Sequence, residues 1–174
     1  MIRKSLSLLA VVLLGACRPV GQAPMHIAVE LAPTGQLRAA INFGNTALAQ
    51  KDPATGEARG VSVDLARELS WRLAVPLDIV PYDAAGKVAA DATKNKWDVA
   101  FFAVDPKRAE DIAFSAPYVI IEGGSEQVMA TPKDRERGAE YLRQFVEEQK
   151  ANGFVAAALA RSGQKDAVVA PPAK

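Results

Sequence analysis

Apolar and polar residues alternate along the chain in blocks that predict strands and helices in turn. An apolar block at residues 37–42 predicts a first strand, and the loop at 43–60 that follows it carries several turn residues. From residue 61 to 75 the apolar side chains recur at helical spacing, which predicts an amphipathic helix ending before Pro76. A second strand is predicted at 77–80.

The same alternation continues through the middle of the chain. The alanine-rich segment at 84–94 predicts a helix, and the apolar block at 97–104 predicts a buried strand. Strands and helices in strict alternation are typical of a doubly wound sheet, because parallel neighbours need a crossover helix between them. The sequence therefore predicts an α/β fold with a mostly parallel sheet and flanking helices.

The last third of the chain predicts a hairpin followed by helices. Gly123 and Gly124 separate two further strands predicted at 118–121 and 126–130, and we expect a hairpin because glycine adopts the positive φ angles of tight turns. Thr131 and Pro132 have the residue types of an N-cap and a first helical position. Two helices are expected after them, the second at 154–161, and then a flexible tail at 164–174.

Residues 1–16 have the pattern of an export signal. Arg3 and Lys4 precede an apolar run at 6–14 that is too short to span a bilayer. The segment Leu14-Gly15-Ala16-Cys17 resembles the bacterial lipobox, in which the cysteine is acylated and then becomes the first residue. We therefore predict an exported, periplasmic protein with Cys17 as lipid anchor, a linker at 17–35, and a folded lobe at 36–163. The alternative is an ordinary secretory signal with an incidental cysteine.

Composition and charge exclude several function classes. Hydrophobic residues make up 49% and charged residues 24% of the 174 residues, which suits one packed domain. The formal net charge is +1 and the basic residues are scattered, so a nucleic-acid partner is not expected. One cysteine and one histidine, His26, supply neither a Cys/His metal set nor a Ser-His-Asp triad. We expect no metal and no cofactor.

Three ordered motifs resemble the extracellular solute-binding proteins of family 3, which are the periplasmic receptors of amino-acid ABC importers. They are GVSVDLAREL at 60–69, WDVA at 97–100 and DPKRAEDIAFSAPY at 105–118. The resemblance implies a type II periplasmic-binding-protein fold, an amino-acid or small carboxylate ligand, and an ABC transporter permease as partner. Members of the family have two lobes joined by two crossing strands. Here only residues 123–125 separate the corresponding strands, so the chain resembles one lobe of such a protein with the second lobe missing.

The resemblance also indicates where a ligand would lie. Arg108 takes the place of the arginine that holds the ligand carboxylate, a role that suits the planar guanidinium, and Ala103 takes the place of a hydroxyl-bearing residue. Alternatively, Arg108 pairs with Asp105 or Asp111 on the surface. Tyr82 is the candidate aromatic side chain for stacking on the ligand.

The loop after the first strand supplies three further candidates. Asn42, Phe43 and Asn45 follow that strand at the carboxyl edge, where open α/β sheets bind ligands. In the alternative interpretation, the asparagines only bond the backbone of their own loop.

Three function classes follow from these residues. The first is an exported solute-binding protein, the second an enzyme of the same fold such as a secreted dehydratase, and the third a ligand-independent adaptor or remnant that acts through a protein partner. Loss of a lobe is expected to expose an apolar wall around Phe43, Phe102 and Tyr118, and such a patch favours a homodimer.

Overall fold

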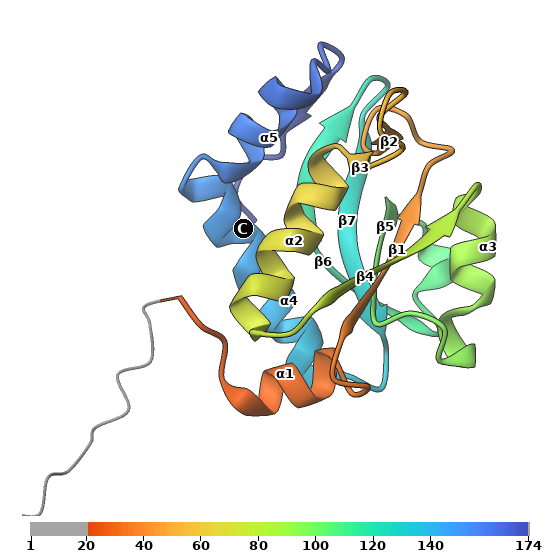
Figure 1. Ribbon diagram of the computed structural model, residues 1–174, viewed down its shortest axis with the longest axis vertical. Helices are drawn as coiled ribbons and strands as arrows, with labels where there is room; N and C mark the ends of the chain where they lie inside the picture. Colours follow the sequence, from red (N-terminus) through yellow and green to blue (C-terminus); the bar gives the residue numbers. More distant parts are fainter. Residues whose placement is uncertain (1–20, 174) are drawn as a thin grey trace, which may run out of the picture.

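The computed structural model describes residues 21–173, so the predicted signal and Cys17 lie outside the described residues. A six-stranded sheet in the order β4-β1-β5-β7-β6-β8 forms its centre (Figure 1). The strands are β1 (Leu37–Asn42), β4 (Leu77–Tyr82), β5 (Val99–Ala103), β6 (Ile112–Ile121), β7 (Ser125–Pro132) and β8 (Ala167–Val169). A separate two-stranded hairpin, β2 (Gln50–Lys51) with β3 (Ala58–Arg59), follows β1.

The direction of the strands confirms the mostly parallel sheet. β1 pairs in parallel with both β4 and β5, whereas β7 is antiparallel to β5 and β6, and β8 is antiparallel to β6. Strands β4, β1, β5 and β6 therefore point in one direction. Crossovers through α2 and through α3 connect the three parallel neighbours, as the alternation of elements predicts.

Helices cover both faces of the sheet. One face carries α1 (Met25–Leu31), α2 (Val61–Leu73), α4 (Glu136–Ala151) and α5 (Phe154–Ser162), which enclose the larger apolar core (Figure 1). The other face carries α3 (Ala85–Ala90) and the 3₁₀ turn η1 (Ala92–Lys94), which pack around Trp97 and Phe102. The amphipathic helix predicted from residue 61 is confirmed as α2; it ends at Leu73 and is capped by Ala74, which adopts a left-handed φ of 54°.

The predicted hairpin is confirmed at Gly123 and Gly124. Both glycines have φ near +80°, and the Gly124 N–H donates to the Ile121 carbonyl at 3.1 Å. Strands β6 and β7 continue from this turn and pair from Ile121 and Ser125 to Ile112 and Pro132. The two strands that resemble the lobe-crossing strands of the family therefore close directly on each other.

Both predicted boundaries of the folded lobe, at residues 36 and 163, are wrong. Long-range contacts extend the lobe beyond each of them. The linker prediction for 17–35 fails over α1, where Ile27 and Leu31 are buried in the main core. The tail prediction for 164–174 fails over β8, which pairs with β6 and brings Ala167 and Ala170 into contact with the rest of the lobe. His26 is exposed as expected, but it stands on a helix rather than in a linker.

The helix start predicted at Thr131 is also wrong. Thr131 and Pro132 are the last residues of β7, and the hydroxyl of Thr131 donates to the Asp98 carbonyl at 3.0 Å. Helix α4 begins at Glu136 instead. The hydroxyl of threonine can cap a helix or donate a hydrogen bond to a neighbouring strand. Thr131 takes the second role because it is buried in the sheet.

Candidate ligand groove

The carboxyl ends of β1, β4 and β5 bring most of the predicted site residues to one edge of the sheet. Asn42 and Tyr82 are the final residues of β1 and β4 and lie opposite each other in register. Ala103 ends β5, the neighbour of β1 on its other side. Open α/β sheets bind ligands outside this edge because the loops there diverge around a crevice.

An open groove of ≈ 500 Å³ lies at this edge, over the ends of β1 and β4. Its lining combines two aromatic side chains with charged ones: Phe43, Gly44, Lys51, Pro81, Tyr82, Asp83 and Lys87. The Lys51 ammonium stands 5.3 Å from the centre of the Phe43 ring, and the Lys87 ammonium is 2.8 Å from the Asp83 carboxylate. The groove thus offers an apolar face beside positive charge, which suits a small organic anion.

Sequence reasoning missed the charged members of this groove. Lys51 ends β2, Asp83 lies in the loop before α3 and Lys87 lies in α3, and no motif joins them. The spacing of Asp83 and Lys87 was the available signal, since side chains four residues apart lie on one face of a helix. Gly44 has a steric role, because a Cβ there would collide with the Asp83 carbonyl. The close approach of the two loops therefore requires glycine.

Tyr82 contributes its ring to the groove, while its hydroxyl is already bound. The hydroxyl donates to the Asp91 carboxylate at 3.0 Å. Burial, together with this carboxylate, raises the pKa of Tyr82 to about 12. The phenol is therefore neutral at neutral pH and is available for stacking rather than for proton transfer.

Arg108 is held at the end of β5 by three partners. Its Nη1 donates to the Ala103 carbonyl at 3.0 Å, its Nε lies 3.6 Å from Asp105 Oδ2, and its guanidinium carbon lies 5.2 Å from the centre of the Phe102 ring. The alternative pairing with Asp105 is thus present. Ala103 acts through its backbone carbonyl, which positions the guanidinium. Among the described residues no acceptor is hydrogen-bonded to Nη2, so this edge of Arg108 retains donors for a carboxylate.

The loop after β1 is shaped by its own asparagine. The Asn42 side-chain oxygen accepts a hydrogen bond from the Gly44 N–H at 3.1 Å, and the Asn42 carbonyl accepts one from the Asn45 N–H at 3.2 Å. The Asn45 carbonyl in turn accepts from Leu48 and Ala49. The bond to the Asn42 side chain agrees with the alternative in which the asparagine bonds the backbone of its own loop, whereas the bonds of Asn45 come from its backbone.

The predicted apolar wall is wrong for two of its three members. Phe102 is 2% exposed and packs edge-on against Phe114, with ring centres 6.1 Å apart. Tyr118 is completely buried, and its hydroxyl lies 3.0 Å from the hydroxyl of Ser62. Tyr118 belongs to the larger core, together with the buried residues of α2, and Phe102 belongs to the smaller core, together with Trp97 and Val88 of α3. Phe43 alone of the three is partly exposed.

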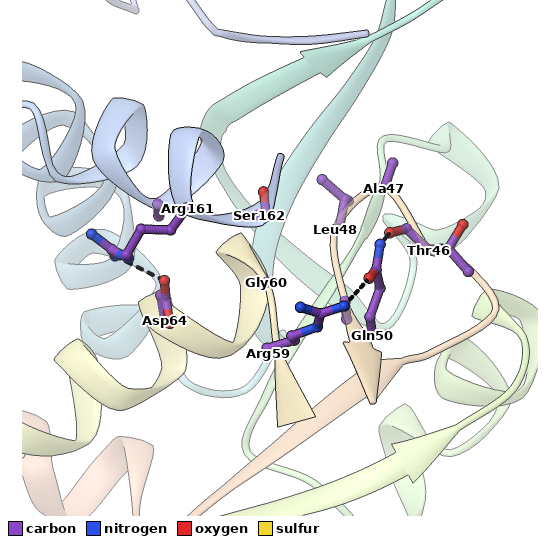
Figure 2. Close-up of a pocket in the computed structure, with 11 residues that line it drawn as sticks. Thr46, Ala47, Leu48, Gln50, Arg59, Gly60, Asp64, Arg161 and Ser162 are labelled. Atoms are coloured by element: carbon purple, nitrogen blue, oxygen red, sulfur yellow. Dashed lines mark hydrogen bonds and ion pairs between the residues drawn. The ribbon is translucent and has the colours of Figure 1, made fainter. Parts of the chain in front are cut away.

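A second, smaller pocket of ≈ 190 Å³ lies between the β2–β3 hairpin and α5 (Figure 2). Its charged and polar side chains bind one another: Arg161 contacts Asp64 at 2.8 Å, and Arg59 donates to Gln50 at 3.2 Å. Figure 2 shows these pairs at the two sides of the pocket. Because Arg161 is paired with Asp64 and the Arg59 guanidinium lies 4.0 Å from the Asp52 carboxylate, this pocket is the weaker candidate for a charged solute.

The described residues contain neither a metal-binding cluster nor a helix that could span a membrane. Between residues 21 and 173, no group of three or more His, Cys, Asp or Glu side chains is arranged to hold a metal ion. Over the same stretch, no helix has both the length and the apolar composition needed to cross a membrane.

A doubly wound lobe with a groove at its carboxyl edge defines an α/β binding domain. Comparison with known families gives the family: the bacterial extracellular solute-binding proteins, family 3, match residues 41–165. The chain belongs to this family. Membership confirms the resemblance carried by the three motifs, and the fold is that of one type II periplasmic-binding-protein lobe.

Solved structures agree with this assignment. The arginine-bound form of domain 1 from TmArgBP of T. maritima is 26% identical, with a TM-score of 0.60 over 68% of this chain and 97% of that chain. An L-arginine-bound amino acid ABC transporter substrate-binding protein from Streptococcus pneumoniae has a TM-score of 0.67 at 12% identity, over 78% of this chain and 97% of that one. An ancestral cyclohexadienyl dehydratase also has a TM-score of 0.67, at 14% identity, over 80% and 96% of the two chains. The last two show the fold alone. No curated protein sequence matches the chain.

Proposed function

We propose that this lobe binds an amino acid or a small carboxylate at the carboxyl edge of β1, β4 and β5, in contact with both the groove and Arg108, which is not one of the residues that line the groove. The observation that carries the proposal is the position of Arg108, whose guanidinium is fixed by the Ala103 carbonyl at the same edge as Phe43 and Tyr82. A guanidinium held in this way binds a carboxylate with little loss of side-chain entropy.

The neighbouring groups complete a site for a zwitterion. Asp105 lies beside Arg108, with its Oδ2 3.6 Å from Nε, so the pair presents one negative and one positive group to a ligand. The ligand carboxylate would face Arg108 and the ammonium would face Asp105. The ring of Phe43 and the ammonium groups of Lys51 and Lys87 would then contact the ligand side chain.

A single lobe suffices for ligand binding in a similar protein. The TmArgBP structure that resembles this chain is an arginine-bound form of domain 1. An open lobe covers less of a ligand than a closed cleft, so we expect weaker affinity than two lobes would give. We propose that the missing second lobe makes this chain a low-affinity receptor for an ABC importer, exported to the periplasm and anchored through acylated Cys17.

An enzymatic function is supported less well. Asp83 is the carboxylate that lines the groove, and the hydrogen bond from Lys87 lowers its pKa. A general base that works near neutral pH needs the opposite shift. The groove therefore favours binding over lyase chemistry.

Thermal unfolding with a panel of amino acids and small carboxylates tests the proposal. Ligand at 100 times its Kd stabilises a protein by about 2.7 kcal/mol, which raises the midpoint by several degrees. We expect such a shift with one class of solute, its loss in Arg108→Gln, and its retention in Arg143→Gln, which removes an exposed guanidinium on α4. A cooperatively unfolding chain that no solute stabilises would refute solute binding by the isolated lobe.

The lipid anchor needs a separate test. Mass spectrometry of the mature chain isolated from bacterial membranes should find an acylated Cys17 at its N-terminus. Replacement by Cys17→Ser should release the protein from the membrane fraction. An unmodified cysteine inside a longer mature chain would contradict the anchor and leave solute binding untouched.

A further inference from the structure

Three large apolar side chains are exposed at the end of the lobe where the described chain begins. Met25 and Val29 stand one helical turn apart on α1 and are 71% and 65% exposed, and Trp71 near the end of α2 is 59% exposed. We call Met25, Val29 and Trp71 the α1–α2 apolar face. Exposed large apolar side chains that gather on one face mark an interaction surface more often than scattered ones do.

The segment before α1 connects the two helices that carry this face. The Ala23 N–H donates to the Arg72 carbonyl at 2.8 Å, which fastens the segment before α1 to the end of α2. A Cβ built on Gly21 would lie 3.7 Å from the Trp71 indole, so the chain passes beside this side chain before it enters α1. Trp71 and α1 therefore both adjoin the segment that leads back to Cys17.

Tertiary contacts hold helix α1 in a fixed position on the lobe. Its inner side chains Ile27 and Leu31 are buried in the main core. The Glu30 carboxylate accepts hydrogen bonds from the Gly138 N–H at 2.9 Å and from Arg137 Nε at 3.0 Å. A helix of this length is stable only when such tertiary contacts hold it. The exposure of Met25 and Val29 is therefore a fixed property of the folded lobe.

The length of chain before Ala23 limits what can cover this face. Five residues lie between Cys17 and Ala23, and each of the six steps along the chain spans at most about 3.5 Å, so the reach is about 20 Å. An acylated Cys17 would hold the α1–α2 apolar face within that distance of the bilayer. This step rests on the anchor in the proposed function.

We propose that the α1–α2 apolar face docks on the lipid surface that carries Cys17. An exposed indole beside aliphatic side chains suits the boundary between head groups and acyl chains, where tryptophan is enriched. A single acyl signal gives only marginal membrane binding, and a second contact of this kind strengthens it. Docking also orients the lobe: α1 lies at one end and the carboxyl ends of β1 and β4 at the other (Figure 1), so the groove faces away from the bilayer.

Fluorescence quenching by lipids tests this docking. The chain has a single cysteine, so a mature form beginning at Cys17 can be coupled to a maleimide lipid in phosphatidylcholine vesicles whose acyl chains are brominated. The coupling supplies the anchor whether or not cells acylate Cys17, and it needs no solute. Failure of docking is thus distinct from failure of the anchor or of solute binding.

Quenching of the indole reports contact with acyl chains. The chain has two tryptophans, and Trp97 is 1% exposed, so we expect Trp71 to be quenched and Trp97 to be spared. Trp71→Phe should abolish the quenching, and Met25→Ser with Val29→Ser should reduce it several-fold. Val168→Ser changes an equally exposed side chain on β8 and is the matched control, expected to leave the quenching as in the wild type.

Three results would overturn the proposal. The first is the absence of quenching in the coupled wild-type chain. The second is quenching that is equal in the wild type and in the Met25→Ser, Val29→Ser chain, since tethering alone would then explain it. The third concerns hydrogen exchange of the α1 amides. If their protection increases with the surface density of the protein but not on addition of lipid, a second copy of the chain covers the face.

Discussion

The carboxylate of Asp98 is bound on two sides by Arg38. Its Oδ2 accepts hydrogen bonds from the Arg38 backbone N–H at 2.9 Å and from Nε at 3.0 Å, and its Oδ1 accepts one from Nη2 at 2.8 Å. Arg135 reaches the same Oδ1 at 2.8 Å, and the Asp98 side chain is fully buried. The aspartate of the WDVA motif therefore joins the amino ends of β1 and β5 to the segment before α4, far from the ligand groove.

Replacement of this carboxylate should destabilise the lobe strongly. Asp98→Asn leaves the guanidinium groups of Arg38 and Arg135 without their counter-charge, both being mostly buried. Removing one partner from a buried ion pair costs about 3–5 kcal/mol, so we expect a loss of that size in the free energy of unfolding measured with urea. Asp83→Asn, which breaks an exposed pair with Lys87, should cost less than about 1 kcal/mol. Equal effects of the two substitutions would contradict the role of Asp98.

The β6–β7 turn should be sensitive to any side chain at its two glycines. Gly123 and Gly124 both have φ near +80°, so Gly123→Ala or Gly124→Ala should each lower the free energy of unfolding by about 1–2 kcal/mol. Gly86 lies within α3, where a Cβ meets nothing within 4 Å. Gly86→Ala should therefore stabilise the lobe by about 0.5–1 kcal/mol. Urea denaturation of the three variants compares them directly, and a neutral Gly124→Ala would show that the turn relaxes.

The ion pair between α2 and α4 should make stability depend on pH in the acid range. Arg72 donates to both oxygens of Glu148 at 2.7 Å, and these hydrogen bonds lower the pKa of Glu148. In this range the unfolded chain binds more protons than the folded chain. The stabilisation by the ion pair is therefore present above the ordinary pKa of Glu148 near 4.5, and it is lost as pH falls through the lower pKa of the folded state.

Glu148→Gln isolates this contribution. Because Glu148 is 54% exposed, solvent screens the pair, and we expect the substitution to cost no more than about 1 kcal/mol at pH 7. The difference from the wild type should disappear at pH values well below 4.5, as followed by urea denaturation. Glu122 lies on the surface at the β6–β7 turn, and Glu122→Gln, which removes an exposed carboxylate there, serves as the control. A difference that grows towards acid pH would contradict the predicted sign.

The buried hydroxyl of Tyr118 should contribute to stability and not to ligand binding. It lies 3.0 Å from the Ser62 hydroxyl and links β6 to the first turn of α2. Tyr118→Phe leaves Ser62 without this partner, so we expect the free energy of unfolding to fall by about 1–2 kcal/mol. Any solute-induced shift in thermal unfolding should be the same in the variant as in the wild type. Loss of that shift with unchanged stability would contradict this purely structural role of Tyr118.

The sequence by itself determined the elements whose signal is local. The apolar spacing from Val61 to Leu73 and the stop at Pro76 specify α2, and the pair Gly123-Gly124 specifies the β6–β7 turn. Strict alternation of strands and helices also determined the shared edge of β1, β4 and β5. The strand pattern placed Asn42 at this edge, because ligands bind outside the carboxyl ends of parallel strands, whereas Tyr82 and Ala103 were chosen through the resemblance to family 3.

Tertiary structure alone decided the parts that depend on contacts between distant segments. Residues 25–31 have no capping signal, yet they form α1 because Leu31 packs against Gly138, where a Cβ would come within 2.6 Å of it. Thr131 joins β7 because β5 and β6 lie on either side of it, and Lys51 joins the groove because its loop folds back over Phe43. Local propensity is worth a few tenths of a kcal/mol per residue, whereas burial of a large apolar side chain is worth about 1.5–3 kcal/mol. Where the two disagree, as at both ends of this lobe, burial prevails.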